Sequence, residues 1–284
     1  ITKRGVSMQI PKLYKYRYFD EPSDNQPARW ETVLFEGKVF PAPPTTFNDP
    51  FDCDLLIDDS FLKSNYFKDM LQDSLIEKYP SSRIGDNAMG FDEWQSNFLE
   101  SDTLSPFREK MFDIFRDFLP TIKEEMLIAC FSELNNSVLM WSHYAQYHTG
   151  FCIEYDLNDW PGCDNLYQVQ YSINAPVYGQ TYLDTNTPAF GSAVVDAALH
   201  KSNEWCYEKE WRIVVPKQNY APIYAAGLRP AFDFSRFITA IYIGAKAKEE
   251  HIQKICQHFH LQPIKIYQMS LQPMTYKLNA NRLQ

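Results

Sequence analysis

The stretch that most constrains the fold is residues 203–215, which read NEWCYEKEWRIVV. Its second half has the composition of a β-strand, and successive strand side chains point to opposite faces. The strand would therefore place two carboxylates and a guanidinium on one face, those of Glu208, Glu210 and Arg212. A strand with one buried face normally puts such charges in water, where an ion pair contributes little. A solvated charged face is the simplest interpretation of this pattern.

Three aromatic and polar runs elsewhere in the chain favour a functional interpretation instead. They are residues 15–17 (KYR), 47–52 (FNDPFD) and 140–144 (MWSHY). Tyrosine and tryptophan combine an apolar ring with a hydrogen-bonding group, which suits the wall of a polar pocket. These runs have the composition of a binding site rather than of a core or a linker.

Composition and charge narrow the class of protein. The chain has 284 residues, of which 45% are hydrophobic, so it can bury a core. Its 27 basic and 36 acidic residues give a net charge of −9, which is not a strong signal for nucleic-acid binding. The six cysteines form no Cys-x-x-Cys pair, and no apolar run has the length of a membrane span. We expect a reduced, cytoplasmic protein without a membrane partner.

The pattern of apolar residues predicts an α+β fold with a mixed or mainly antiparallel sheet core. We expect one domain over residues 1–284, with a helical insertion at 58–122 where apolar residues recur at helical spacing. Strands are predicted at 13–18, 39–40, 126–131, 151–155, 167–171, 210–215, 240–243, 264–267 and 274–278. Helices outside the insertion are predicted at 30–35, 138–147, 193–202 and 248–259.

The spacing of histidine, serine and glycine argues against several common kinds of site. His143 and His148 miss by one residue the i, i+4 spacing that would let a helix present both to a metal, so we predict no metal site. Ser142 is adjacent to His143 and cannot form a nucleophile pair with it, and the chain lacks a Gly-x-Ser-x-Gly motif. Its 10 glycines are dispersed, so a glycine-rich phosphate-binding loop is not expected.

Several blocks of the chain resemble a bacterial family catalogued as a domain of unknown function, family 2971. The resemblance extends over about residues 12–245, and it implies a shared fold without an established activity. The blocks that carry it are 13–17 (LYKYR), 47–52 (FNDPFD), 130–133 (CFSE), 140–145 (MWSHYA) with His148 and Gly150, and Lys201 with 205–212 (WCYEKEWR).

The order of a basic residue, a serine and a Glu-x-Glu pair also resembles ADP-ribosyltransferases. Here these are Arg17, Ser132 and residues 208–210. The resemblance implies an NAD-consuming ADP-ribosyltransferase or NAD glycohydrolase, for example a toxin or a phage-defence effector, with a macromolecular acceptor that the sequence does not identify. It implies Glu210, Glu208, Ser132 and His143 as the catalytic group. Residues implied to hold NAD are Arg17, Lys15, Tyr14, Asn48, Trp141, Tyr144 and Arg212.

Within that resemblance each group has an expected role. Arg17 would pair with the pyrophosphate, because a guanidinium matches phosphate oxygens in a fork. Tyr144 would stack on the nicotinamide, and Glu210 would hydrogen-bond the ribose and stabilise the charge that develops as nicotinamide leaves. Glu208 would orient or deprotonate the acceptor. The chain departs from the usual Ser-Thr-Ser run, because Ser132 lies between Phe131 and Glu133.

Two alternatives to an enzyme follow from the same residues. A non-catalytic module could bind a nucleotide or a protein through this cleft, in which case Glu210 would be held in an ion pair with Arg212 or Lys201. A structural interpretation makes the loop at 47–52 and the helix that carries Tyr144 parts of one polar network. The enzyme hypothesis predicts that Arg17, Ser132, His143 and Glu210 meet at one cleft.

Overall fold

The computed structural model describes residues 9–22, 28–57, 119–178 and 188–284 of the 284-residue chain. Its strands are β1 (Leu13–Arg17), β2 (Lys38–Val39), β3 (Leu56–Ile57), β4 (Met126–Ser132), β5 (Phe151–Tyr155), β6 (Leu166–Gln168), β7 (Gln170–Ser172), β8 (Val177–Tyr178), β9 (His200–Ser202), β10 (Glu210–Pro216), β11 (Phe232–Asp233), β12 (Ile238–Ile243), β13 (Lys265–Leu271) and β14 (Leu278–Arg282).

Helices of two kinds connect these strands. The α-helices are α1 (Arg29–Phe35), α5 (Val138–Tyr144), α6 (Pro188–Ala197), α7 (Ala221–Ala225) and α8 (Glu249–Phe259). Short 3-10 helices are η1 (Pro44–Thr46), η5 (Cys163–Asn165), η7 (Asn203–Glu208), η8 (Lys217–Tyr220) and η9 (Ser235–Phe237).

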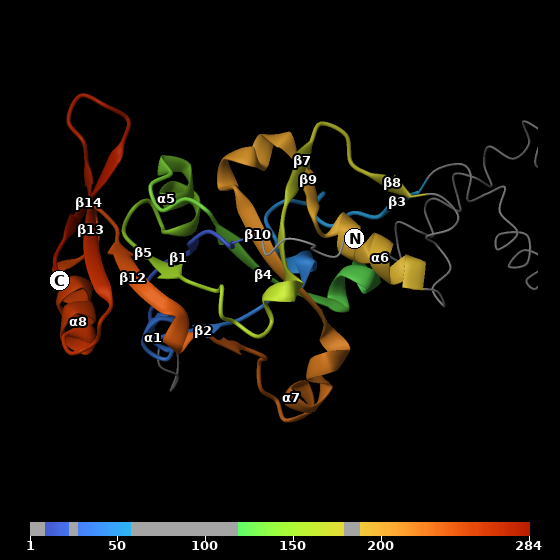
Figure 1. Cartoon of the computed structure of the whole chain (residues 1–284), viewed down its shortest axis with the longest axis horizontal. Coiled ribbons are helices and arrows are strands. Elements are labelled where there is room, and N and C mark those ends of the chain that lie inside the picture. Colours follow the sequence, from blue (N-terminus) through green and yellow to red (C-terminus); the bar gives the residue numbers. More distant parts are fainter. Residues whose placement is uncertain (1–8, 23–27, 58–118, 179–187) are drawn as a thin grey trace, which may run out of the picture.

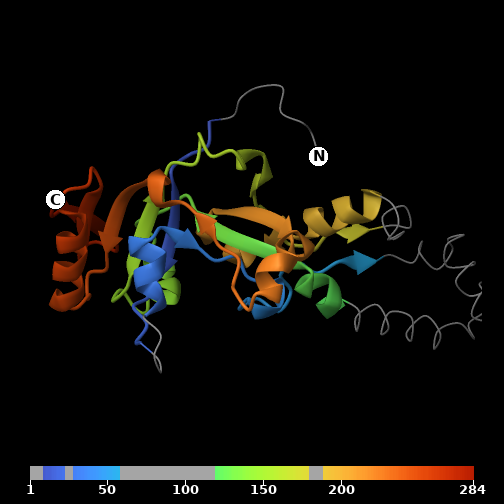
Figure 2. The ribbon, with the colours of Figure 1, turned by 90° about the horizontal axis from the view of Figure 1, so that it is seen from below.

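A sheet of eight strands forms the centre of the described structure (Figure 1). Its order is β14-β13-β12-β5-β1-β4-β10-β6, and the only parallel pair among its described strands is β12 with β13. The sheet is therefore mixed and mostly antiparallel, which confirms the predicted α+β class. Figure 2 shows the chain turned by 90°, with α8 in red at the end that carries the C-terminus.

Apolar side chains pack on both faces of this sheet. On one face, α1 and α8 place Leu34, Ile255 and Phe259 in a cluster with strand residues such as Phe151 and Trp211. The apolar positions of α8 lie three and four residues apart, which is the spacing of one helix face. A second cluster joins α5 to strand residues, and it contains Tyr16, Met140, Trp141, Cys152 and Tyr242.

The predicted ends of three elements need correction. Helix α5 ends at Tyr144 rather than near 147, because Gln146, Tyr147 and His148 have φ of 46°, 57° and 71° and turn the chain away. The helix predicted at 193–202 is α6, which ends at Ala197 and is followed by strand β9. The strand predicted at 274–278 is instead a turn, and β14 begins at Leu278.

Some sequence predictions fall outside the described residues. The helical insertion predicted at 58–122 does so except for its last four residues, which belong to a helical stretch at 119–124. Within the described part of the chain, no helix has both the length and the apolar character needed to cross a lipid bilayer. All six cysteines are free, with Cys53 and Cys152 buried and Cys206 exposed.

The separation of two central strands positions the site. β1 pairs with β5 along its whole length, from Leu13 to Arg17, but its register with β4 is the single pair Tyr14 and Ser132. Beyond that pair, Lys15 reaches β4 only through its side chain, which donates to the Cys130 carbonyl. A cavity therefore opens where β1 and β4 diverge within the sheet.

Candidate functional site

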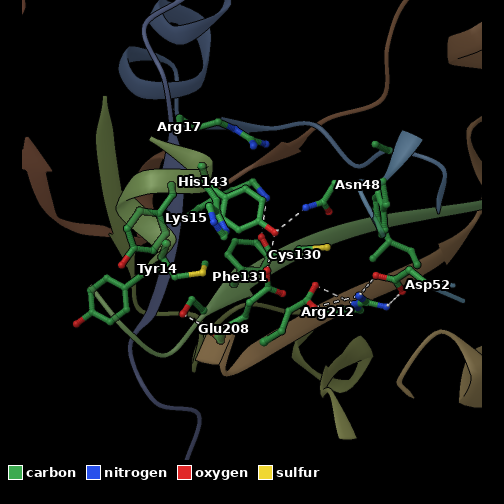
Figure 3. Close-up of a pocket in the computed structure, with 18 of the residues that line it drawn as sticks. Tyr14, Lys15, Arg17, Asn48, Asp52, Cys130, Phe131, His143, Glu208 and Arg212 are labelled. Atoms are coloured by element: carbon green, nitrogen blue, oxygen red, sulfur yellow. Dashed lines mark hydrogen bonds and ion pairs between the residues drawn. The ribbon is translucent and has the colours of Figure 1, made fainter. Parts of the chain in front are cut away.

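A cavity of about 430 Å³ opens between β1, β4, the segment at 40–52, α5, β9 and the start of β10 (Figure 3). Its volume lies in the range of small-molecule sites. The structure brings Arg17, Ser132, His143 and Glu210 together around this cavity, although they lie far apart in the sequence. The other predicted site residues that line it are Tyr14, Lys15, Asn48, Tyr144, Glu208 and Arg212.

Trp141 is the exception among the predicted site residues. Its side chain is fully buried in the core cluster of α5, where it meets the edge of Tyr16 and stacks on His148. The indole nitrogen donates to the Asn135 carbonyl at 2.8 Å. Trp141 does not line the cavity, because α5 presents Tyr144 there and turns Trp141 into the core.

Arg212 is the centre of a buried ion-pair network. Its guanidinium donates twice to Asp52, at 2.7 Å each, and its Nε and Nη2 donate to the two oxygens of Glu210 at 2.9 and 3.0 Å. A fifth hydrogen bond, of 2.7 Å, reaches the Ala198 carbonyl. The predicted shared strand face of Glu210 and Arg212 is confirmed, and this face is buried rather than solvated. The network attaches the loop that carries Asp52 to the sheet.

Lys201 from β9 extends this network to a third carboxylate. Its ammonium lies 2.7 Å from Glu208, 3.2 Å from Glu210 and 3.5 Å from Asp52. Burial works against the charged ammonium, but the three carboxylates outweigh it and raise the pKa of Lys201. Burial also disfavours the charged form of Glu210 and alone would raise its pKa, but Arg212 and Lys201 outweigh this effect and lower the pKa to about 2. Both groups are therefore charged at neutral pH.

Glu208 reaches the cavity by a route that the sequence pattern did not predict. The strand begins at Glu210, whereas Glu208 ends the 3-10 helix η7, and Lys209 between them has a left-handed φ of 47°. The prediction that Glu208 belongs to the same strand is therefore wrong. Its side chain still meets that of Glu210, because both accept hydrogen bonds from Lys201.

Tyr144 links Glu208 to the loop at 47–52. The Tyr144 hydroxyl donates to Glu208 Oε1 at 2.5 Å and accepts from the Asn48 amide at 3.3 Å. Burial raises the pKa of Glu208, although Lys201 opposes the shift. Each Glu208 oxygen has one hydrogen-bond donor within the described residues, which leaves acceptor capacity toward the cavity.

Ser132 and His143 are engaged with neighbouring groups. The Ser132 hydroxyl donates to the Glu208 carbonyl at 2.5 Å and accepts from the Leu134 amide at 3.0 Å, so it fixes the backbone on which Glu208 is carried. His143 is exposed at the cavity, where its Nδ1 lies 3.1 Å from the Tyr207 hydroxyl and its ring meets the edge of Tyr144.

Two cations on β1 lie apart from this network (Figure 3). Lys15 donates to the Cys130 carbonyl at 2.6 Å and lies 4.9 Å from the centre of the Phe131 ring. Arg17 has neither a hydrogen bond nor an ion pair with any side chain of the described residues. Neither Lys15 nor Arg17 has a carboxylate partner there, so this wall of the cavity presents positive charge to a ligand.

Asp52 is a member of the site that the sequence pattern does not reveal. Lys201 is predicted only as a possible ion-pair partner of Glu210; that pair is present at 3.2 Å, and the contacts of Lys201 with Glu208 and Asp52 are additional. Asp52 meets Arg212 across 160 residues of chain. Lys201 belongs to a segment that was predicted to be helical, and strand β9 is what directs it at Glu208.

Fold and site together define an α+β protein whose divided mixed sheet holds a charged, ring-lined cavity. Residues 140–213 match the model of a family described as a protein of unknown function, DUF2971. This match includes Tyr144, Glu208 and Arg212, whereas Lys15 and Arg17 lie outside it. No curated protein and no solved structure matches the chain. The comparisons therefore give no support to the resemblance to ADP-ribosyltransferases.

Proposed function

We propose that the cavity binds a phosphate-bearing nucleotide, with NAD as the first candidate. The observation that carries the proposal is the pair of basic side chains on β1, Lys15 and Arg17, which face the cavity without a carboxylate partner among the described residues. Arg17 would hold the pyrophosphate in a forked contact, and the Lys15 nitrogen would donate a further hydrogen bond. Tyr14 and Tyr144 line the same cavity and offer ring surface to a base.

The proposed reaction is cleavage of the bond between nicotinamide and ribose. Nicotinamide leaves with the bonding electrons, and the ribose carbon is then attacked by water or by an acceptor group. A carboxylate near that carbon stabilises its developing positive charge. Glu208 suits this role because it retains acceptor capacity and is positioned by Tyr144 and Lys201. Glu210 supports it by holding Lys201 and Arg212 in place.

A second candidate function is non-catalytic nucleotide binding. The observation that favours it is the environment of Glu210, whose oxygens already accept from Arg212 twice and from Lys201 once. A carboxylate engaged in this way has little capacity left for a ribose hydroxyl. In this alternative the network keeps the cavity in shape, and the nucleotide is held by the basic side chains of β1 alone.

Isothermal titration calorimetry tests whether the cavity binds nucleotides. We expect NAD and ADP-ribose to bind measurably and nicotinamide, which lacks phosphate, to bind far more weakly. Arg17→Ala should weaken NAD binding by roughly 10- to 100-fold, since a hydrogen bond to a charged group contributes about 1.5–3 kcal/mol. Arg29→Ala, which removes an exposed arginine of α1, is the matched control. Absence of binding by both nucleotides would refute the proposal.

Nicotinamide release, followed by chromatography, then separates the enzyme from the binding module. We expect release by the native protein, alone or with cell extract as a source of acceptor. Glu208→Gln should slow release by roughly 10²- to 10³-fold with little change in NAD affinity. Binding without release under either condition would instead establish the non-catalytic alternative.

A further inference from the structure

Lys15 occupies an unusual position for a lysine. It lies on the central strand β1, is 6% exposed and lines the cavity. Its described contacts are the Cys130 carbonyl, at 2.6 Å, and the face of the Phe131 ring. Lysine is almost never fully buried unless it is paired with an acid, and Lys15 forms no ion pair with any carboxylate that the structure describes.

The surroundings of Lys15 favour its uncharged form. Burial and the guanidinium of Arg17 lower the pKa of Lys15 to about 7, against the opposing effect of Cys130 and Glu210. These three residues are the titratable groups that act on it from β1, β4 and β10. At pH 7 about half of the Lys15 amine would be free of its proton, compared with fewer than about one in a thousand molecules for an ordinary lysine. An uncharged amine is a nucleophile.

We propose that Lys15 is a reactive amine that forms an imine with anionic carbonyl compounds, whose phosphate contacts Arg17. The Lys15 nitrogen bonds to the carbonyl carbon, the carbon–oxygen double bond is replaced by a carbon–nitrogen double bond, and the oxygen leaves as water with the two protons of the amine. No oxidant or reductant is consumed. The cavity combines what such a ligand needs, an amine and, on the same strand, a guanidinium that pairs with no carboxylate in the described part of the chain.

Imine formation at Lys15 does not require NAD cleavage, but a product of that cleavage could form the imine. ADP-ribose, a product of NAD cleavage, is a reducing sugar whose open-chain form has an aldehyde and two phosphates, so it belongs to the predicted class of ligand. NAD itself has no aldehyde and cannot form the imine. Imine formation can therefore be found or refuted whether or not nicotinamide is released.

The test traps the imine on the full-length native protein. Pyridoxal 5′-phosphate, an aldehyde with one phosphate, is added below one equivalent at pH 7 and the imine is reduced with borohydride. Peptide mass spectrometry then locates the label. We expect Lys15 to be labelled at least about tenfold more than Lys12, an exposed lysine that pairs with Asp156. Pyridoxal without the phosphate should lose most of this preference for Lys15.

Further arms make the assignment specific. An excess of ADP-ribose should protect Lys15 from the label, and labelling of Lys15 should fall several-fold between pH 8 and pH 6. Arg17→Ala should reduce labelling by pyridoxal phosphate but leave labelling by pyridoxal unchanged. Because the label is located on the native chain, the result does not depend on whether a Lys15 variant folds. Labelling of Lys15 no greater than that of Lys12 would overturn the inference.

Discussion

Replacement of Arg212 by lysine should destabilise the protein strongly although the charge is kept. The guanidinium makes five hydrogen bonds to oxygen, two to Asp52, two to Glu210 and one to the Ala198 carbonyl. An ammonium has three donors on a single nitrogen and cannot span the two carboxylates as the planar fork does. At least two charge-assisted hydrogen bonds are lost, at a side chain that is fully buried in the native protein.

The size of the effect follows from these contacts. Each lost hydrogen bond to a charged group contributes about 1.5–3 kcal/mol, so we expect the free energy of unfolding to fall by about 3 kcal/mol. This agrees with the range of about 3–5 kcal/mol for disrupting a buried ion pair. With a urea dependence of about 3 kcal/mol per molar, the midpoint of unfolding should move down by about 1 M.

Urea unfolding followed by fluorescence and circular dichroism measures this shift. Arg236→Lys is the matched control, since Arg236 is exposed on η9 and its replacement should change the free energy of unfolding by less than about 0.5 kcal/mol. The double variant of Arg212→Lys with Asp52→Asn should lose less than the sum of the single changes, because the two residues share one interaction. Equal midpoints for Arg212→Lys and Arg236→Lys would refute the assigned role of the network.

Three further outcomes are expected. Gly150→Ala should destabilise the fold and weaken nucleotide binding, because a Cβ there would lie 2.2 Å from the Arg17 carbonyl oxygen. Gly191→Ala in α6 is the control: a Cβ there meets open space, so this change should stabilise the protein by up to about 1 kcal/mol in urea unfolding. The pKa of Glu210 is about 2 in the folded protein, below its unfolded value, so about 3 kcal/mol of the free energy of unfolding should be lost as the pH falls from about 5 to 2. Urea titrations at a series of pH values should show this loss in the native protein and little of it in Glu210→Gln. The pKa of Lys15 in the folded protein lies below its unfolded value of 10.5, so the unfolded chain binds more protons between about pH 7 and 10.5. The free energy of unfolding should therefore rise with pH across that window, and Lys15→Met should flatten the rise in the same urea titrations.

Local patterns in the sequence predicted the elements that carry the site. Strand alternation placed Glu210 and Arg212 on one face, and the ion pair between them lies there. Apolar spacing predicted α1 and α8, and a short apolar run predicted β4. These predictions are correct because a repeat of two or of 3.6 residues is a property of neighbouring residues in the chain.

The remaining features depend on contacts that no local pattern encodes. Lys209 adopts a left-handed conformation, which a lysine rarely does, and this turn removes Glu208 from the strand. Asp52 has no predicted role because its partner Arg212 lies 160 residues away. The sequence predicts a pair of Lys201 with Glu210, but it does not predict that Lys201 also contacts Glu208 and Asp52. Trp141 is predicted to line the site because its indole N–H can donate to a ligand, but this group donates instead to the Asn135 carbonyl within the core.

The divided sheet also sets the order in which the protein can mature on the ribosome. Lys15 is synthesised 115 residues before Cys130, and Asp52 is synthesised 160 residues before Arg212. Until the segment from Lys201 to Arg212 emerges, Asp52 lacks both of its cationic partners, and the walls around Lys15 are incomplete. A nascent chain that has not reached Arg212 therefore contains no finished cavity, and binding there can begin only after this residue has been synthesised.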